Sequence, residues 1–417
     1  MRVLMLSWEY PPKSVGGLAQ HVYDLTSALI KEETEVFLLT CGSPGAPEYE
    51  QINGVHVYRI NPYQVSSPDF ITWVMQLNVA MLERAIPLIN DLRDIQIVHA
   101  HDWLVAYAAR ALKHAHQVPM VVTIHATEYG RNNGLHNDLQ RHISDIEWWL
   151  CYEAWRVICC SFYMKNELSY VFQIPQDKLK VIPNGVNPEN FVLKESRLSR
   201  DDYAAPDEKI IFYVGRLVRE KGVQVLLEAM PDILSRQEKT KLIIAGKGPH
   251  EAQLREQAVR MGIAHRVYFT GYINDEVRNA LYHWADVAVF PSLYEPFGIV
   301  ALEAMAAKTP VVVTDNGGLS EIVIHGVDGL KAYCGNSRSL ADNILPILQQ
   351  RKLAATLRDN AYRKVVKDFN WSKIAKNTIQ VYKEVLKEHR MSNWSGQDNM
   401  QGVIDRFSRL FGNARTS

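Results

Sequence analysis

The sequence lacks several features that mark specialised classes of protein. Among its 417 residues, 46 basic side chains balance 46 acidic ones, so no net charge attracts the chain to nucleic acid or to an anionic membrane. No apolar run reaches the roughly eighteen residues of a membrane span, and the N-terminus lacks the pattern of a secretion signal. The five cysteines are odd in number and lack metal-ligand spacing, which favours free thiols in a reducing compartment. We therefore expect a cytoplasmic protein with no transmembrane segment and no nucleic-acid partner.

What is present is the material for large α/β domains. Hydrophobic residues make up 47% of the chain and charged residues 22%, as in ordinary globular proteins, and the length suggests two or three domains. Strand-like runs alternate with helical patterns, clearest over residues 18–29, which predicts a parallel sheet with helices on both faces. The strands expected in the first half are Val3–Leu6, Glu35–Thr40, Val55–Arg59, Ile95–His99, Met120–His125, Arg156–Cys160 and Lys180–Ile182.

The alternation pauses once and then restarts. Residues 184–208, rich in proline, Asn-Gly and charge, predict a linker, and six further strand-like runs follow it, from IIFYVGR to GLKAY. We predict an α/β protein with two doubly wound, Rossmann-like domains over residues 1–185 and 186–372, a helix over 373–390 and a polar tail over 391–417. Ligands of such sheets bind beyond the carboxyl ends of the strands, so a central cleft is the expected site.

Two consecutive glycines stand in the loop after the first expected strand. Gly16 and Gly17 precede the first helix, where unpaired backbone N–H groups and the helix dipole favour an anion. Glycine also lets the backbone approach a phosphate or a sugar closely, although the same pair suits a simple turn. Their spacing departs from the G-x-G-x-x-G dinucleotide fingerprint, which disfavours a nicotinamide dehydrogenase.

Other polar side chains follow expected strands. HAHDW brings His101 and Asp102 toward the sheet edge, and TIH does the same for His125. A lone histidine at a strand end is more often structural, but three polar residues at neighbouring edges favour a shared ligand. In the second half, GRLVREKG carries Arg216 and Lys221 on one loop. Such a pair suits a diphosphate, because arginine forks across two oxygens and lysine supplies a movable charge.

The stretch SLYEPFGIVALE carries two acids around a helix start. Glu295 precedes a Pro-Phe-Gly turn, Gly298 opens a helix, and Glu303 follows after seven intervening residues. The first carboxylate is therefore expected in the cleft loop and the second about a turn and a half into the helix. Both carboxylates are therefore expected to reach one ligand whose phosphate group binds at the helix N-terminus. An ordinary capped helix with a surface glutamate explains either acid alone.

These motifs together resemble a known family. EPFGIVALE resembles the E-x7-E signature of the family 4 retaining glycosyltransferases, which share the two-domain GT-B fold, and GRLVREKG, VIPNGVN, AGKGP and NGGLSEIV resemble its other landmarks in the same order. The resemblance covers about residues 1–388, and GGLAQHV, HAHDW and TIH in the first half are similar to glycogen and starch synthases. It implies an acceptor-side first domain, a nucleotide-sugar-binding second domain and a last helix that crosses back to the first.

The resemblance also implies roles for individual residues. Arg216 and Lys221 would neutralise the departing diphosphate in place of a metal ion, which fits a chain without a D-x-D triplet, so no metal site is expected. Glu295 would hold hydroxyls of the donor sugar, His125 would lie beside the sugar ring, and Asp102 would lie toward the acceptor. The residues expected to bind the nucleotide, phosphates or acceptor are Gly16, Gly17, Gly246, Gly248, Gly298, Ile299, Val300 and Glu303, of which Glu303 would hold the ribose.

The expected activity is a metal-independent hexosyl transfer. The donor would be a nucleotide sugar such as ADP-glucose or UDP-glucose, with no further cofactor. The acceptor would be a saccharide, and elongation of an α-1,4-glucan is the leading hypothesis. The family retains anomeric configuration, and we expect a front-face substitution because no carboxylate is an obvious nucleophile.

Two alternatives stay open. Ser14 stands where glycogen synthases carry the lysine of K-x-G-G-L, and EPFG and GGLSE are forms typical of family 4 at large. The acceptor could therefore be a lipid, a sugar phosphate or a polysaccharide precursor, although the first helix lacks the basic, apolar-faced stripe that a lipid favours. The second alternative is a non-catalytic scaffold that binds a nucleotide sugar. The presence of Arg216, Lys221, Glu295 and His125 together argues against it, because a scaffold need not retain all four.

Overall fold

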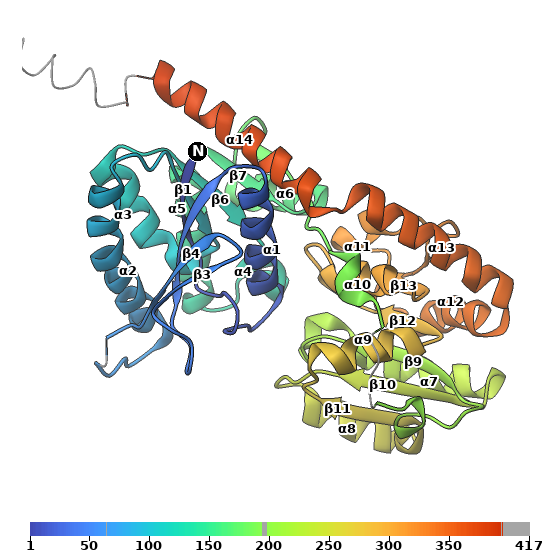
Figure 1. Ribbon diagram of the computed structural model, residues 1–417. Coiled ribbons are helices and arrows are strands. Elements are labelled where there is room, and N and C mark those ends of the chain that lie inside the picture. The colour runs from blue at the N-terminus through green and yellow to red at the C-terminus, as the bar shows by residue number, and fades with distance from the viewer. Residues whose placement is uncertain (64, 194–197, 393, 395–417) are drawn as a thin grey trace, which may run out of the picture.

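The structure, a computed structural model, describes residues 1–63, 65–193, 198–392 and 394. Within them the chain forms two parallel-sheet units of alternating strands and helices, which appear as two lobes in Figure 1. The α/β class predicted from the sequence is confirmed. Most of the expected tail, residues 395–417, and residues 194–197 of the expected linker lie outside the described part.

The first sheet has eight strands in the order β3-β4-β2-β1-β5-β6-β7-β8. All neighbours pair in parallel except β3 and β4. The strands are β1 (Arg2–Leu6), β2 (Glu35–Cys41), β3 (Tyr49–Ile52), β4 (Val55–Ile60), β5 (Ile97–His101), β6 (Met120–Ile124), β7 (Arg156–Cys159) and β8 (Leu179–Val181). The helices of this half are α1 (Gly17–Lys31), α2 (Phe70–Leu92), α3 (Ala106–His116), α4 (Glu128–Asn132), α5 (Asp138–Glu153) and α6 (Phe162–Phe172).

Alternate residues of each strand serve opposite faces of this sheet. Val3 and Met5 of β1 pack with α1, whereas Leu4 and Leu6 pack into the core that includes α2 and α3. All four are fully buried, as expected for strands covered on both faces.

The second sheet has six parallel strands in the order β11-β10-β9-β12-β13-β14. They are β9 (Lys209–Val214), β10 (Thr240–Ala245), β11 (Val267–Gly271), β12 (Val287–Phe290), β13 (Val311–Thr314) and β14 (Leu330–Ala332). Their helices are α7 (Val223–Arg236), α8 (Glu251–Arg260), α9 (Asp275–Trp284), α10 (Ile299–Ala306), α11 (Gly317–Ile322), α12 (Ser337–Gln349) and α13 (Arg351–Asp368).

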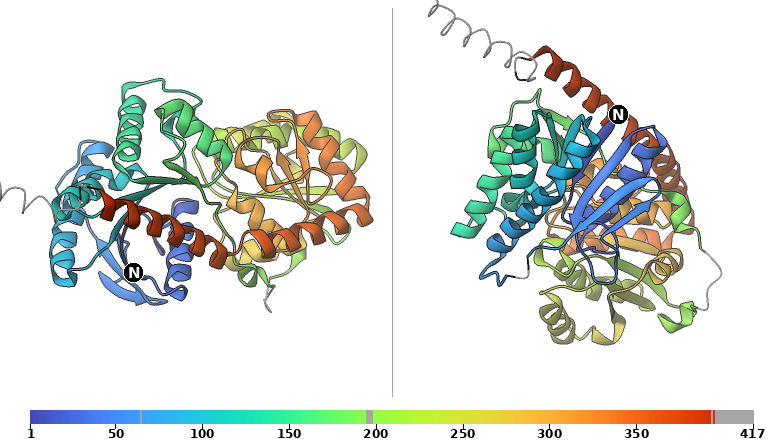
Figure 2. Two further views of the ribbon diagram at one scale, coloured as in Figure 1. Left: turned by 90° about the horizontal axis from the view of Figure 1, so that it is seen from above. Right: turned by 60° about the vertical axis from the view of Figure 1, so that its left-hand side comes forward.

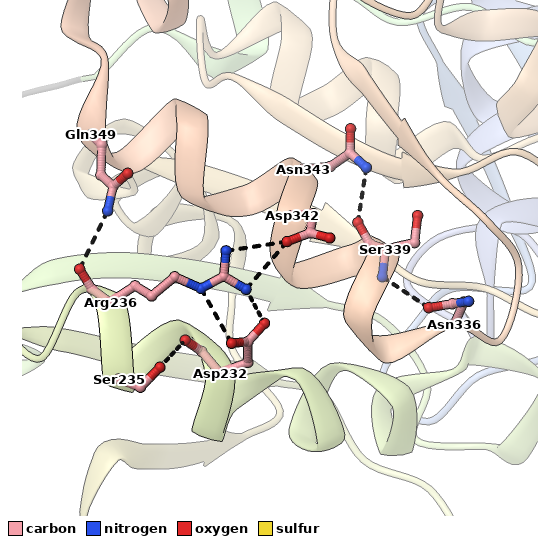
Figure 3. Close-up of polar contacts among 8 residues, drawn as sticks. All are labelled: Asp232, Ser235, Arg236, Asn336, Ser339, Asp342, Asn343 and Gln349. Atoms are coloured by element: carbon pink, nitrogen blue, oxygen red, sulfur yellow. Dashed lines mark hydrogen bonds and ion pairs between the residues drawn. The ribbon is translucent and has the colours of Figure 1, made fainter.

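Helices α7 and α12 lie side by side on one face of the second sheet and are joined by polar contacts (Figure 3). Arg236 of α7 forms ion pairs with Asp232 on its own helix and with Asp342 on α12. Gln349, the last residue of α12, donates a hydrogen bond to the carbonyl oxygen of Arg236. These contacts sit outside the apolar seam and hold the C-terminal ends of both helices together.

The last helix, α14 (Trp371–Met391), packs on the first sheet rather than the second. Figures 1 and 2 show it running from the second lobe across to the first, where it lies beside α1. The buried hydroxyl of Tyr382 lies 2.6 Å from Nδ1 of His99 on β5, and Lys180 and Glu384 form an ion pair at 3.0 Å. The helix therefore ties the end of the described chain to the first half.

One strand was missed from the sequence, and the bounds of another were wrong. Antiparallel β3 was not predicted, because YEQI is only partly buried at the sheet edge and lacks an apolar run. The strand expected at Ile95–His99 is β5, which runs from Ile97 to His101. His101 therefore ends the strand, fully buried, instead of lying in the loop after it. Among the described residues, no helix is both long and apolar enough to cross a membrane.

Candidate active site

The order of the strands reverses at one central pair in each sheet. These pairs are β1 and β5 in the first sheet and β9 and β12 in the second. Loops that leave such a pair at the carboxyl ends diverge, and ligands of doubly wound sheets bind in the crevice between them. These four loops and the helix starts that follow them carry several of the residues predicted to act on the donor and acceptor, among them Gly16, Gly17, Asp102, Arg216, Lys221 and Glu295.

An ion pair joins the two loops of the second sheet. Nζ of Lys221, after β9, lies 2.6 Å from Oε2 of Glu295, after β12. The hydroxyl of Ser292 donates to the same oxygen at 3.2 Å. The structure thus brings together two residues 74 positions apart that the sequence assigned to one ligand. Their opposite charges meet at the carboxyl edge of the second sheet, where the order of the strands reverses.

Arg216, on the same loop as Lys221, is half exposed and is held only loosely by Glu220, at 3.9 Å. It faces the first half of the chain. Glu9, in the loop after β1, is buried, and burial raises the pKa of its carboxyl while the charge of Arg216 lowers it. The guanidinium of Arg216 therefore remains available to an anion that enters between the two units.

In the first sheet, Asp102 and His125 are joined directly. Oδ1 of Asp102 accepts the backbone N–H of His125 at 2.8 Å. Burial raises the pKa of Asp102 to about 6, and burial, helped by the charge of Arg131, lowers the pKa of His125 to about 3. His125 is therefore neutral at pH 7 and suited to hydrogen bonding rather than to carrying a charge.

Asp102 has a strained backbone. Its φ of 59° lies in the left-handed region, which costs a residue other than glycine of the order of 1–3 kcal/mol. The backbone N–H of Asp102 donates to the carbonyl oxygen of Thr123 at 3.0 Å. These bonds hold the carboxyl in place beside His125.

The two halves of the chain touch at the predicted site. A Cβ atom on Gly17 would lie 3.1 Å from Cδ1 of Ile299, so the loop before α1 lies against the first turn of α10. On α1, the pKa of Asp24 is raised to about 6, mainly by burial and to a smaller degree by the negative charge of Glu303 nearby. The loop with Gly16 and Gly17, called the glycine loop below, and helix α10, which carries Glu303, therefore form one site.

Comparison with known proteins identifies the family. The Glycosyltransferase Family 4 model matches residues 15–190, and the Glycosyl transferases group 1 model matches residues 195–364. An uncharacterized glycosyltransferase of Methanocaldococcus jannaschii is 42% identical over 392 residues, which cover 93% of this chain and 99% of that protein. The chain belongs to the family 4 glycosyltransferases.

Two further relatives agree with this assignment. A glycogen synthase of Mycobacterium tuberculosis is 37% identical over 396 residues, 92% of this chain and 94% of that protein. The solved structure of sucrose-phosphate synthase from Thermosynechococcus elongatus covers 93% of this chain and 100% of its own, with a TM-score of 0.80 and 26% identity. The predicted family and the GT-B fold are confirmed.

Glu303, the second acid of the signature, is held by neighbours in the glycosyltransferase. Oε2 accepts a hydrogen bond from the Tyr282 hydroxyl at 3.2 Å and lies 3.9 Å from Nε of Arg278. Burial raises the pKa of Glu303, and Arg278 and Tyr282 oppose that rise. Sequence analysis did not identify Tyr282 and Arg278, because each lies on α9 among ordinary amphipathic positions.

The predicted phosphate-binding residues are placed at the start of α10. Gly298 has a φ of 107°, a left-handed value that favours glycine, and precedes Ile299 and Val300 in the first turn. Backbone N–H groups in a first turn have no partner within their own helix, so these two suit a phosphate oxygen.

Gly246 and Gly248 have a packing reason of their own. A Cβ atom would lie 1.9 Å from the carbonyl oxygen of Gly215 at the first position and 2.2 Å from that of Leu217 at the second. Both glycines therefore permit the loops after β9 and β10 to touch through their backbones. Lining of the nucleotide pocket by this pair stays a prediction.

Glu9 is a site residue that sequence analysis missed. Its Oε2 accepts backbone N–H bonds from Val15 at 2.7 Å and from Gly16 at 3.2 Å, and so shapes the glycine loop. The available signal was an acid in SWEYPP, between an apolar strand and the glycine pair.

Further contacts fasten the two halves away from the switch points. The carboxylate of Glu321 accepts the backbone N–H groups of Phe162 at 2.9 Å and Tyr163 at 2.7 Å, and so caps α6 from the other half. The hydroxyl of Ser161 donates to the carbonyl oxygen of Pro296 at 2.6 Å, one residue after Glu295. The packing of the two halves against each other is thereby linked to the geometry of the loop that carries Glu295.

Proposed function

We propose that this glycosyltransferase moves glucose from a nucleoside diphosphate glucose to an α-1,4-glucan, with retention of anomeric configuration. The observation that carries the proposal is the meeting of Lys221 and Glu295 at the switch point, with Arg216 on the same loop and the glycine loop opposite. The preference for a glucan is supported by the 37% identical relative named glycogen synthase and by the similarity of the first half to such enzymes.

Departure of the nucleoside diphosphate is the step that needs positive charge. Lys221 and Arg216 would stabilise the charge that develops on the leaving phosphate, and the free N–H groups of Ile299 and Val300 would bind its oxygens. The backbone N–H groups are fixed by the fold before the donor binds, so their contribution needs little reorganisation during the reaction. We propose on this ground that transfer proceeds without a divalent ion.

Glu295 would change partner when the donor binds. In the structure it neutralises Lys221 at 2.6 Å. A donor phosphate near Lys221 would take over that cation, and the carboxylate would be free to accept hydrogen bonds from sugar hydroxyls. This exchange keeps the buried charges paired at each stage.

The first domain would hold the sugar and the acceptor. Neutral His125 would hydrogen-bond a hydroxyl of the donor ring, and Asp102, whose pKa burial raises to about 6, would lie toward the acceptor. The leaving phosphate would help to remove the proton of the acceptor hydroxyl in a front-face substitution. We also propose a cytoplasmic location, which the five free cysteines support.

A sugar phosphate is the second candidate acceptor. The solved neighbour with a TM-score of 0.80 is named sucrose-phosphate synthase, and it covers nearly the whole chain. That name supports a phosphorylated acceptor in a protein with this arrangement of domains.

A screen of donors against acceptors tests both proposals. Purified full-length protein is incubated with ADP-, UDP- or GDP-glucose and with glycogen, maltooligosaccharides, glucose 1-phosphate or fructose 6-phosphate, while nucleotide release and product length are followed. Lengthened maltooligosaccharides support the glucan proposal, and a phosphorylated disaccharide supports the alternative. Transfer to neither class, with donor hydrolysis retained, contradicts both acceptors. Addition of EDTA should not lower the rate, and a loss of rate would contradict metal independence.

A further inference from the structure

Three histidines from separate elements meet at the carboxyl edge of the first sheet. They are His21 on α1, His101 at the end of β5 and His125 directly after β6. One ring nitrogen of each lies within 4.8 Å of those of the other two. Nδ1 of His101 and Nε2 of His125 are 3.1 Å apart. Two histidine nitrogens on one tetrahedral zinc ion, each about 2.0–2.1 Å from the metal, lie roughly 3.3 Å apart, so this pair already has the separation that a shared ion needs.

The same rings carry ring nitrogens that are buried without partners. His21 is 5% exposed, and neither of its ring nitrogens forms a hydrogen bond of normal geometry with the described residues, although the Asn184 side chain is close enough to interact with the ring and favours its protonated form. Nε2 of His101 is also buried and unpartnered. A buried polar atom without a partner is costly, so the two nitrogens of His21 point to a ligand, whereas the His101 nitrogen that faces His125 is Nδ1.

A neighbouring histidine shows the contrast. His99 lies next to His101, with ring centroids 4.4 Å apart. Both of its nitrogens are satisfied, by the Tyr382 hydroxyl at 2.6 Å and the Thr123 hydroxyl at 2.8 Å. Missing partners are therefore a property of His21 and His101 and not of every buried imidazole in this region.

The charges around the three rings also permit a cation. Asp102 binds the backbone N–H of His125 and brings a carboxyl group beside the cluster. The charge of Arg131 acts on both Asp102 and His125 and offsets that carboxylate. A divalent ion held by neutral imidazoles would thus not be placed in a region of uniform positive charge.

We propose that His21, His101 and His125 bind one transition-metal ion of the zinc class, and that the bound ion inhibits transfer. Imidazole ligands suit zinc, copper, iron and nickel, and three histidines with a water molecule in the fourth position form a familiar tetrahedral zinc site. Each ring coordinates through an unprotonated nitrogen, so the proton now between His101 and His125 moves to another ring nitrogen. Inhibition follows because the ion holds the His125 ring away from the sugar, and this half of the proposal rests on the role proposed for His125.

Cobalt provides a direct test that needs no substrate. Co²⁺ in a tetrahedral site absorbs visible light far more strongly than hydrated Co²⁺. Full-length protein should therefore bind one Co²⁺ per chain with a tetrahedral spectrum, and Zn²⁺ should displace it. The His21→Phe variant keeps a ring of similar size and removes both unpartnered nitrogens, so it should fold. It should weaken Co²⁺ binding at least about 100-fold, the upper end of the loss for an outer-shell partner.

Two more variants complete the test. His101→Asn removes a second ligand and should weaken binding similarly, whereas His142→Ala, at an exposed position on α5, should leave binding unchanged. Thermal unfolding verifies that each variant is folded. A missing tetrahedral spectrum at one equivalent, or a spectrum that survives in both His21→Phe and His101→Asn, would overturn the site. Binding of Zn²⁺ without loss of nucleotide release would overturn the inhibitory half, and with it the role of His125.

Discussion

Lys221 and Glu295 form a 2.6 Å ion pair although they lie on loops that follow different strands, β9 and β12. Their side chains are 19% and 11% exposed, so the pair is largely shielded from water. Backbone bonds reinforce it, because the N–H groups of Leu293 and Tyr294 donate to the carbonyl oxygen of Glu220 at 2.8 and 3.2 Å. The pair therefore sets the relative position of the two loops that would contact the donor.

Loss of the lysine charge should reduce turnover strongly. In Lys221→Ala, we expect kcat for transfer to fall by about 10²–10³, as removal of one preorganised stabilising group typically does. The control is Lys239→Ala, which removes an exposed lysine paired with Asp207 in the same half of the chain. Nucleotide release measured at saturating donor decides the matter. Unchanged turnover in Lys221→Ala would contradict the phosphate role.

A methyl group on Gly17 should disturb closure through one identified contact. The new Cβ would lie 3.1 Å from Cδ1 of Ile299, which is closer than side chains normally pack. Overpacking costs about 1–3 kcal/mol, so kcat/KM of Gly17→Ala should fall roughly tenfold. Ile299→Val removes that Cδ1 atom, and the double variant should regain most of the loss. An equal defect in the single and double variants would show that the contact is not the cause.

The alternation of strands and helices was readable because parallel strands buried on both faces leave apolar runs, as in VVTI before His125. The sequence also placed Lys221 and Glu295 together, since both follow strands at one sheet edge. It could not give Glu9 or Glu321, whose roles arise from backbone N–H groups that no side-chain pattern reveals. The shift of β5 to include His101 was missed because histidine carries no strand signal of its own.

Glu321 should contribute to holding the two halves closed. Its carboxylate accepts two N–H bonds at the start of α6, where the helix dipole favours a negative charge. Glu321 is exposed, so the loss in Glu321→Ala is expected to be about 1 kcal/mol, equal to a roughly fivefold weaker affinity for the nucleoside diphosphate of the donor. Calorimetric titration measures it, and Glu238→Ala, at another exposed site, is the control. Equal affinities for the two variants would argue against a closing role.

The contact between α14 and the first sheet should be worth a measurable part of the stability. Tyr382→Phe removes the hydroxyl at 2.6 Å from His99 and leaves a buried nitrogen without a partner. The expected cost is about 1–3 kcal/mol in the free energy of unfolding. Tyr333→Phe removes a hydroxyl from a side chain that is 74% exposed and should cost little. Urea unfolding of both variants compares them, and equal stabilities would contradict the contribution of this bond.

His99 should make the free energy of unfolding fall as the pH falls, and this effect can be separated from those of other buried groups. Burial lowers its pKa to about 3, below the 6.5 of a free imidazole. Below pH 6.5 the unfolded chain binds a proton at His99 that the folded chain does not. The contribution of neutral His99 is therefore complete above that pH and is lost as the pH falls toward 3, by up to about 1.4 kcal/mol per pH unit.

Other buried groups act in the opposite direction and make the total profile uninformative. Burial raises the pKa of Asp102 and of Asp24 to about 6, so each stabilises the folded state at low pH and loses that effect as the pH rises from about 4 to 6. The difference between wild type and His99→Gln cancels these terms, because glutamine does not titrate. Between about pH 6.5 and 5, the stability deficit of His99→Gln should shrink by about 1.6 kcal/mol in urea unfolding. His142→Ala, at an exposed position, is the control for loss of a histidine side chain. A constant deficit for His99→Gln would mean that His99 already binds a proton in the folded protein near pH 6, despite its burial against Tyr382 and Thr123.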